Sequence, residues 1–269
     1  MRLQELAGNV AIVTGGAAGI GQATAELLAA EGASVVIADL DEDRGHEVAS
    51  RIGDGAAFWQ TDVSDADQVQ ALVDFAVERF GGLDIMFNNA GIGSPLKRFL
   101  PDDLEDFSRI MSVNLFGVLA GSQRAARYMK DNGGGSIINN ASIAAVNAGA
   151  GMISYRASKA AVAHVTKCMA IDLAPYGIRV NCLTPAHIRT GITTYEMGPV
   201  LRYMQPLERE ARSEDVANAV VFLASERAAQ VTGIVFPIDG GTTAGPPYAQ
   251  TKLIMSTANP PEGSSPSSS

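Results

Sequence analysis

Seven short apolar runs alternate with longer helical patterns along this chain, and that alternation limits the possible folds more than any other feature. The first two runs, "VAIVTG" at 10–15 and "SVVIADL" at 34–40, are apolar almost throughout. Continuous apolar runs of this length indicate strands that are buried on both faces, as in a parallel sheet. The other predicted strands span 56–63, 83–91, 136–142, 178–186 and 234–241, and the predicted helices include 19–31, 65–80, 102–130, 152–174 and 213–225. The sequence therefore predicts an α/β protein with a doubly wound parallel sheet of about seven strands and helices on both faces.

The domain organisation follows from where the composition changes. The 269-residue chain has no linker-like stretch until its last part, so we predict one domain over 1–245. Residues 190–212 form a long insertion with two tyrosines and two methionines. This insertion is too apolar for free disorder, and we interpret it as a substrate lid. Residues 246–269 form a C-terminal extension whose Pro- and Ser-rich end is typical of a disordered tail.

The net charge of −9 and the absence of Lys/Arg runs exclude the usual signature of a nucleic-acid partner or an anionic membrane surface. Only two cysteines occur, Cys168 and Cys182, and their spacing fits neither a metal motif nor a disulfide framework. We expect two buried thiols and no metal. The N-terminus lacks a signal-peptide layout, and no apolar run is long enough for a bilayer, so a soluble, cytoplasmic protein is expected.

A glycine cluster follows the first predicted strand, in "VTGGAAGIGQA". Gly15, Gly19 and Gly21 stand where the strand turns into a helix. Glycines there let the backbone approach a pyrophosphate closely, and the helix N-terminus offers free N–H groups. The spacing is G-x-x-x-G-x-G, and a tight turn with no ligand would also need such glycines.

Asp39 ends the second predicted strand, where a carboxylate would meet an adenosine ribose. Its oxygens would accept hydrogen bonds from both ribose hydroxyls and would repel a 2′-phosphate. Ala18 and Leu40, close to that position, supply no cation to bind such a phosphate. These residues predict NAD as the cofactor. The alternative is a solvated acidic loop, because three further acidic residues follow directly at 41–43.

Tyr155 and Lys159 open the helix predicted over 152–174, in "ISYRASKA". A spacing of four residues places both side chains on one helix face. A free tyrosine has a pKa near ~10, too high for a base at neutral pH, and a nearby ammonium favours the phenolate. Such a phenol would exchange a proton with an alcohol or a carbonyl. Taken alone, the pair would more often be a half-buried Tyr beside a surface Lys.

Other motifs occur with this pair in a fixed order. Ser142 ends the fifth predicted strand, and Asn114 in "MSVNLFG" lies inside a predicted helix, an unfavourable place for Asn unless its side chain has a task. "NNAG" at 88–91 ends the fourth strand and "PAHIRT" at 185–190 ends the sixth. With the glycine turn, this set resembles the short-chain dehydrogenase/reductase family from about Val10 to Gly241. The resemblance implies a single-domain Rossmann-type fold.

The resemblance also implies roles for individual residues. Tyr155 would be the general acid/base, Lys159 would lower its pKa and hold the nicotinamide ribose, and Ser142 would bind the substrate oxygen. Asn114 would hold a water that relays protons from Lys159, and Thr190 would hold the nicotinamide carboxamide with Ile188 behind it. The implied cofactor-binding residues are Gly15, Ala18, Gly19, Ile20, Gly21, Asp39, Leu40, Asp62, Val63, Asn89, Ala90, Gly91, Tyr155, Lys159, Pro185, Ile188 and Thr190.

One departure from the family pattern is Ala186, where the family often has glycine after the proline. Alanine tolerates fewer backbone conformations, so the loop that carries Thr190 is expected to sit differently. The neighbouring His187 either faces substrate or is structural.

The expected substrate is an uncharged cyclic or hydrophobic secondary alcohol, oxidised to a ketone with NAD. Its predicted pocket is small and apolar, with Ile143, Ala144, Val146 and Met152, while Arg156 is expected to point elsewhere. A sugar or acyl-thioester substrate stays open, as do a nucleotide-sugar epimerase or dehydratase and a non-catalytic dinucleotide-binding regulator. The long helices 102–130 and 152–174 carry many small residues, and the resemblance implies that they pair in a homotetramer or homodimer.

Overall fold

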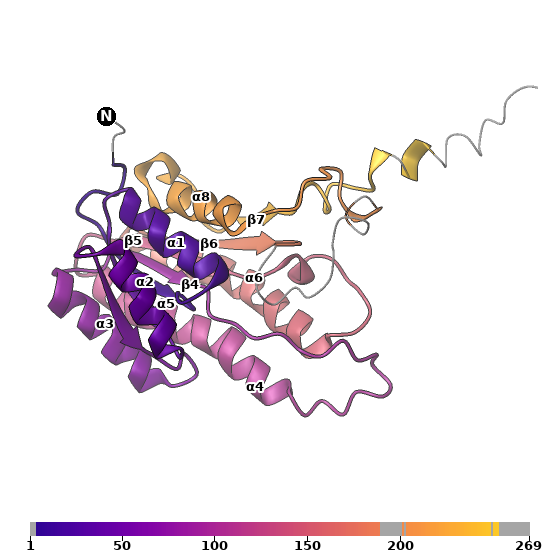
Figure 1. The fold of residues 1–269 in the computed structure, drawn as a ribbon, viewed down its shortest axis with the longest axis horizontal. Coiled ribbons are helices and arrows are strands. Elements are labelled where there is room, and N and C mark those ends of the chain that lie inside the picture. Colours follow the sequence, from indigo (N-terminus) through magenta and orange to yellow (C-terminus); the bar gives the residue numbers. More distant parts are fainter. Residues whose placement is uncertain (1–3, 189–200, 202, 249, 253–269) are drawn as a thin grey trace, which may run out of the picture.

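The computed structural model describes residues 4–188, 201, 203–248 and 250–252. Its centre is a single parallel sheet with the strand order β3-β2-β1-β4-β5-β6-β7 (Figure 1). The strands are β1 (Val10–Thr14), β2 (Ser34–Asp39), β3 (Ala56–Gln60), β4 (Ile85–Asn88), β5 (Gly135–Asn140), β6 (Ile178–Pro185) and β7 (Val235–Ile238). The seven predicted strands and the fold class are confirmed.

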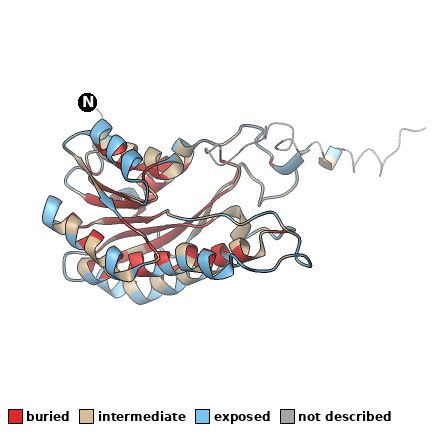
Figure 2. Cartoon of the chain, turned by 60° about the horizontal axis from the view of Figure 1, so that its bottom comes forward, coloured by how far each residue is buried: buried red, intermediate tan, exposed pale blue. Residues whose placement is uncertain are grey.

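Helices cover both faces of the sheet. The helices α1 (Gly19–Ala30), α2 (Glu42–Ile52) and α8 (Ser213–Ala224) pack on one face, and α3 (Ala66–Phe80), α5 (Gly117–Met129) and α6 (Ile153–Leu173) pack on the other. Figure 2 shows that buried residues concentrate on the strands and on the inner sides of these helices. The apolar runs of the sequence are thus buried in two helix–sheet interfaces.

The strand order reverses between β1 and β4. These two strands are hydrogen-bonded neighbours, with Val13 paired to Phe87, while the chain leaves β1 toward β2 and leaves β4 toward β5. At such a switch point the connections diverge, and a crevice opens beyond the carboxyl ends of the strands. The glycine turn after β1 and the "NNAG" segment after β4 meet at this crevice.

The helix predicted over 102–130 is divided in the structure. It consists of α4 (Phe107–Met111), a π-helix over Ser112–Phe116 and α5, and residues 102–106 lie outside it. A single turn of π-helix within a longer helix often marks a functional position. Asn114 sits in the middle of this turn and is fully buried.

The acidic residues after Asp39 begin a helix that the sequence analysis missed. Asp41 is the N-cap of α2 and accepts the N–H of Arg44 at 3.1 Å, and Glu42 and Asp43 follow in the first turn. Residues 41–43 are exposed, as the alternative of a solvated acidic loop expected, but they begin a helix and not a loop, because carboxylates are favoured at a helix N-terminus.

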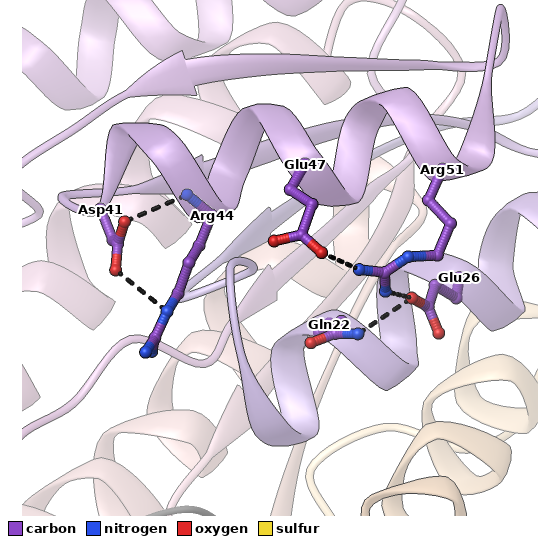
Figure 3. A network of polar contacts seen from close by, with 6 residues as sticks. All are labelled: Gln22, Glu26, Asp41, Arg44, Glu47 and Arg51. Atoms are coloured by element: carbon purple, nitrogen blue, oxygen red, sulfur yellow. Dashed lines mark hydrogen bonds and ion pairs between the residues drawn. The ribbon is translucent and has the colours of Figure 1, made fainter.

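A surface network ties α2 to α1 (Figure 3). Arg51 lies 2.7 Å from Glu26 on α1 and 2.8 Å from Glu47 on its own helix, and Gln22 donates to Glu26 at 3.0 Å. Exposed pairs of this kind contribute little stability. They do hold α1, which begins at the glycine turn, against α2, which begins just after Asp39.

The two thiols differ. Cys182 on β6 is buried as expected, but Cys168 on α6 is exposed, so the expectation of two buried thiols is wrong for Cys168. The buried face of α6 carries Val162, Thr166 and Ala170, and this spacing turns position 168 outward.

Only the second part of the proposed lid lies within the described residues. There Leu201 and Gln205 are buried, and Leu207 donates its N–H to Gly240 at 2.9 Å, so this part packs on the turn after β7. Most of the C-terminal extension lies outside the described residues. Within the part of the chain that the structure describes, no helix is long and apolar enough to cross a membrane.

Candidate active site

The turn after β1 has a shape that only glycine allows. Gly15 and Gly19 have φ values of 64° and 55°, in the left-handed region. A Cβ on Gly21 would lie 1.9 Å from the carbonyl oxygen of Gly15, so the start of α1 presses directly on the turn. Ala18, the N-cap of α1, caps no N–H group with its side chain. The first N–H groups of α1 are therefore available to an anion.

Asn89 braces this turn from the neighbouring strand. Its Nδ2 donates to the carbonyl oxygens of Thr14 at 3.0 Å and Gly15 at 3.1 Å. In return, the Thr14 hydroxyl accepts the N–H groups of Asn89 at 2.9 Å and Ala90 at 3.1 Å. The segment after β4 therefore holds the glycine turn in place, a task that the sequence analysis had not assigned to Thr14.

Asp39 lies where the sequence placed it, at the end of β2 and against the glycine turn. Its Oδ2 accepts the N–H of Ala17 at 3.0 Å, and its Oδ1 accepts the N–H of Asp41 at 3.2 Å. The next residue, Leu40, is 63% exposed. A fixed carboxylate at this edge can accept further hydrogen bonds from a diol and disfavours a phosphate group.

Asp62 and Val63 follow β3 at the same edge. Asp62 accepts from the N–H of Ser64 at 2.9 Å and from its hydroxyl at 2.7 Å. Val63 is buried, and a Cβ on Gly117 would lie 2.8 Å from its side chain. The start of α5 thus closes the side of the crevice near these residues.

Asn114 anchors the segment after "NNAG". Its Oδ1 accepts the N–H of Ile92 at 2.8 Å, and its Nδ2 donates to the Ile92 carbonyl at 2.9 Å and to the Ser158 hydroxyl at 3.1 Å. Both amide hydrogens are therefore engaged. A Cβ on Gly91 would lie 3.2 Å from both Asn114 Oδ1 and Lys159 Nζ, which places Asn114 close to the lysine.

Ser142, Tyr155 and Lys159 come together at the carboxyl end of β5. The Ser142 hydroxyl accepts the N–H of Ala144 at 3.1 Å and lies close enough to the Tyr155 phenol to lower its pKa. Lys159 is buried, and its Nζ donates to the carbonyl oxygen of Asn140 at 2.9 Å. The same nitrogen lies 5.8 Å from the centre of the Tyr155 ring. Ser142, Tyr155 and Lys159 thus lie at one end of the sheet, and their catalytic roles stay a prediction.

The electrostatics of this cluster differ from the expectation. Burial raises the pKa of the Tyr155 phenol above its usual value, and the nearby Ser142 hydroxyl and the charge of Arg156 offset only part of that effect. The predicted net lowering of this pKa is wrong, because desolvation of a phenolate outweighs these contacts. Burial also lowers the pKa of Lys159 to about 8, against a smaller opposing effect of Cys182.

Asn140 joins the two parts of the site, and the sequence analysis did not single it out. Its carbonyl oxygen holds Lys159, and its Nδ2 donates to Asn89 Oδ1 at 2.8 Å. Asn89 in turn holds the carbonyl of Gly15. The signal that could have found this link is the pair of adjacent asparagines at the ends of both β4 and β5.

The segment after β6 is described only in part. Pro185 is buried, Ala186 donates its N–H to Ile238 at 3.0 Å, and Ile188 is 8% exposed. Ala186 does not have a positive φ, so it adds no strain at the position where the family often has glycine. His187 is half-buried, and burial lowers its pKa. Thr190 lies outside the described residues.

Comparison with known proteins extends over nearly the whole chain. A family model described as Enoyl-(Acyl carrier protein) reductase matches residues 15–243. The cis-4-hydroxycyclohexanecarboxylate dehydrogenase of Sinomonas cyclohexanicum is 40% identical over 247 residues, which are 90% of this chain and 99% of that protein. The chain belongs to the short-chain dehydrogenase/reductase family.

Two further similarities show what this short-chain dehydrogenase/reductase resembles. The 3-alpha-(or 20-beta)-hydroxysteroid dehydrogenase of Mycobacterium tuberculosis (strain ATCC 25618 / H37Rv) is 40% identical, over 89% of this chain and 91% of that protein. The crystal structure of a 3-ketoacyl-(acyl-carrier-protein) reductase from Brucella melitensis, complexed with NADH, is 37% identical. It superposes with a TM-score of 0.84 over 88% of this chain and 99% of that one. The named relatives are dehydrogenases and reductases, which supports an oxidoreductase activity for this short-chain dehydrogenase/reductase.

Proposed function

We propose that this protein is an NAD-dependent oxidoreductase that interconverts a secondary alcohol and a ketone. The observation that carries the proposal is the buried Lys159 beside the Tyr155 phenol, with the Ser142 hydroxyl close enough to that phenol to lower its pKa. A buried ammonium and a phenol in one cluster are costly to keep unless they do chemistry. A dinucleotide-binding regulator would not need them.

The residues around the switch point fit a nicotinamide dinucleotide. The glycine turn and the N–H groups at the start of α1 suit a pyrophosphate, because both offer main-chain donors without side chains in the way. The carboxylate of Asp39 suits a ribose diol and disfavours a 2′-phosphate, which supports NAD over NADP.

The chain's own residues would handle the proton. Bound NAD would accept a hydride from the carbon that carries the hydroxyl group. Ser142 would hold the substrate oxygen, and Tyr155 would take the hydroxyl proton as the carbonyl forms. Lys159, fixed by Asn140, would stabilise the phenolate form of Tyr155 that accepts this proton, and the proton transfer would leave Tyr155 as a neutral phenol. Asn114 would contribute to a proton relay from Lys159 through its main-chain carbonyl, since its amide hydrogens are already engaged.

The proposed substrate is uncharged and cyclic or hydrophobic. Ile143 and Ala144 follow Ser142 directly, and Met152 lies at the start of α6, so the walls next to the reacting groups are apolar. The names of two relatives, a cis-4-hydroxycyclohexanecarboxylate dehydrogenase and a 3-alpha-(or 20-beta)-hydroxysteroid dehydrogenase, support a ring-bearing alcohol, and the second name supports an uncharged one. A 3-ketoacyl substrate is the second candidate, because the NADH-bound neighbour carries that name. A nucleotide-sugar epimerase or dehydratase is disfavoured, since those relatives carry a G-x-x-G-x-x-G turn and position 18 here is alanine.

The test is a panel of secondary alcohols, including alicyclic, terpenoid and steroid members, assayed with NAD and NADP at the absorbance of reduced nicotinamide. We expect turnover of uncharged ring alcohols with NAD. Tyr155→Phe keeps the ring but removes the phenolic hydroxyl group that would exchange the proton. We expect a fall in kcat of about 10³-fold or more with unchanged NADH affinity. Turnover that survives this change, or that occurs only with charged hydroxyacids or acyl-thioesters, would contradict the proposal.

We also propose a homotetramer, or a homodimer, that forms through α5 and α6, in a cytoplasmic setting. Leu119 on α5 and Ile171 on α6 expose 37% and 75% of their surface, and a groove of about 450 Å³ runs between these helices. Sedimentation equilibrium at micromolar concentration measures the assembly, and a monomer there would contradict it.

A further inference from the structure

Arg156 follows Tyr155 in the sequence, yet its side chain turns back toward the loop that precedes α6. Its Nε donates to the carbonyl oxygen of Gly151 at 3.0 Å, and its Nη1 donates to that of Asn147 at 3.0 Å. Between these two contacts the guanidinium lies against Gly149, where a Cβ would come within 2.5 Å of Nη2. The expectation that Arg156 points away from a substrate clamp fits this geometry, but the sequence analysis gave the side chain no task.

The loop that Arg156 holds, residues 146–152, connects the two hydroxyl-bearing residues of the site. It begins after the 3₁₀ turn Ile143–Ala145, which Ser142 caps, and it ends where α6 begins, two residues before Ser154 and three before Tyr155. The two carbonyls that Arg156 binds lie near the two ends of this loop. If this loop moved, the position of Ser142 relative to Tyr155 would therefore change.

The loop carries two signs that it needs such a restraint. Met152 has a φ of 56°, a left-handed conformation that costs a non-glycine residue free energy and persists only where the surroundings fix it. Gly151 has a φ of 73°, and a Cβ there would lie 2.9 Å from Leu96 and 3.0 Å from the carbonyl of Lys97. The loop is thus pressed between the segment after β4 on one side and the guanidinium on the other.

We propose that Arg156 is a positioning residue: it fixes the loop 146–152 and thereby the distance between the Ser142 and Tyr155 hydroxyls. This inference rests on the proposed function for its catalytic consequence, but its structural part does not. The guanidinium of Arg156 has two of its five N–H donors committed to the loop by these bonds. The planar guanidinium presents its N–H groups in a fixed fork that can bind two carbonyl oxygens at once, whereas the ammonium of a lysine is a single point charge without this fork.

Arg156 also acts on Tyr155 through its charge. That charge lowers the pKa of the phenol, although burial is the larger effect and raises it. Other ionisable groups near this cluster include Lys159 and, farther along the same helix, the exposed Lys167, both of which act on Cys182 of β6. Burial raises the pKa of Cys182 to about 11, so the thiol is neutral at neutral pH. Loss of the guanidinium charge should therefore shift the phenol's titration to higher pH.

Two variants of Arg156 separate its geometric and electrostatic contributions. Arg156→Gln removes both the fork and the charge, and we expect kcat/KM for the alcohol to fall about 10- to 100-fold, since small misplacements of reacting groups have effects of this size. The rising limb of the pH profile for oxidation should move to higher pH. Arg156→Lys keeps the charge, so the limb should stay in place while part of the loss in kcat/KM remains.

Gly149→Ala tests the same contact without touching Arg156. The new methyl group would occupy the place of the guanidinium and push it off the loop, while the main chain at Gly149 needs no positive φ. We expect this variant to lower kcat/KM without moving the pH limb. The double variant with Arg156→Gln should be no worse than Arg156→Gln alone, because both changes break one interaction.

Hydrogen exchange provides a readout that needs no turnover. Amides of residues 143–153 should exchange faster in Arg156→Gln and in Gly149→Ala, while the glycine turn at 14–21 and the dissociation constant for NADH should stay as in the wild type. Lys167→Gln, a change of an exposed cation farther along α6, is the matched control and should alter none of these quantities.

The proposal is overturned if exchange in the loop and kcat/KM are unchanged in both variants. It is also overturned if NADH affinity falls as far as kcat/KM, because that pattern indicates a general loss of structure. If the wild type turned over no alcohol, the proposed function would fail, whereas the exchange measurement would still decide whether Arg156 holds the loop.

Discussion

The glycine turn after β1 and the cluster at the end of β5 lie at the same edge of the sheet but are built from different parts of the chain. The turn is made of main-chain atoms, and its partners Asn89 and Asp39 mainly hold it in shape. The β5 cluster is made of side chains, and its central group, Lys159, is an ammonium that is only 4% exposed. The first region depends on the absence of side chains, and the second depends on their chemistry.

This difference shows where each region is vulnerable. In the turn, the limiting factor is steric, because added atoms collide with a fixed main chain. In the cluster, the limiting factor is electrostatic, because a buried ammonium loses its hydration and regains only part of that free energy from a carbonyl. A change in the turn should therefore abolish binding, whereas a change in the cluster should abolish chemistry and leave the fold as stable as before or more so.

The largest effect on cofactor binding is expected from Gly21→Ala. Its Cβ would lie 1.9 Å from the Gly15 carbonyl oxygen and 2.8 Å from Asn89 Nδ2, so the turn and its brace must both shift. A displacement of this size misplaces the N–H groups that would hold the pyrophosphate, and we expect NADH affinity to fall at least ~100-fold. Fluorescence titration of NADH measures this loss.

Gly55→Ala is the matched control for the turn. The nearest atom to a Cβ at Gly55 is the Ala33 carbonyl oxygen at 4.0 Å, and the residue needs no positive φ. Its NADH affinity should match the wild type. If Gly21→Ala also kept wild-type affinity, the main-chain origin of the binding site would be disproved.

Lys159→Met should abolish turnover but stabilise the fold. The pKa of Lys159 is about 8 in the folded chain, below the usual value of 10.5, so the unfolded chain binds more protons between these two values. The stability of the wild type should therefore rise with pH across this window, and the full cost of the buried charge applies below it. That cost is about 3 kcal/mol, offset by about 1 kcal/mol for the hydrogen bond to Asn140 that methionine lacks.

Urea unfolding at pH 7 and at pH 10 measures the effect of Lys159→Met. We expect the variant to be more stable than the wild type at pH 7 by about 2 kcal/mol and to lack the wild type's rise in stability toward pH 10. Cys182, whose pKa rises from 9.0 to about 11 on folding, lowers stability as the pH rises above about 9, but this effect is common to the wild type and the variant, so the difference between them isolates Lys159. A variant that is less stable than the wild type at pH 7 would contradict an electrostatic cost at this position.

The two regions also differ in how far the sequence revealed them. Glycine spacing and the acidic end of β2 are local signals, so the sequence alone predicted that Gly15 and Gly21 lie in the turn after β1 and that Asp39 ends β2, as in the structure. The helical spacing of Tyr155 and Lys159 identified that pair, but it did not predict the net rise in the phenol's pKa, because burial depends on everything packed around the ring. The helix α2 was not predicted, since the three acidic residues at its start are also typical of a solvated loop.

Contacts made by a side chain that turns back toward an earlier part of the chain could not be predicted from the sequence. The Arg156 guanidinium binds residues five and nine positions earlier, and Asn140 reaches Asn89 across two strands. No periodicity encodes these contacts. The division of the helix over 102–130 by a π-helix had one sequence signal, an asparagine at position 114, which predicted a task for the side chain but not the change in helix type.

The smallest effect is expected from Asp39→Asn, which changes the charge of the turn's side-chain partner but not its shape. The amide oxygen can still accept the N–H of Ala17, so the turn should keep its geometry, while the exposed N–H of Asp41 loses its side-chain acceptor. Loss of the negative charge should lower the repulsion of a 2′-phosphate, and we expect the ratio of kcat/KM for NADP to that for NAD to rise about tenfold, equivalent to about 1.4 kcal/mol. Asp41→Asn, two residues away at the N-cap of α2, is the control, because asparagine caps a helix as well as aspartate does. Of these two carboxylates, that of Asp39 accepts a hydrogen bond from the glycine turn, and that of Asp41 accepts one from Arg44. If both variants changed the ratio equally, the acidic segment as a whole, and not the carboxylate of Asp39, would set the cofactor preference.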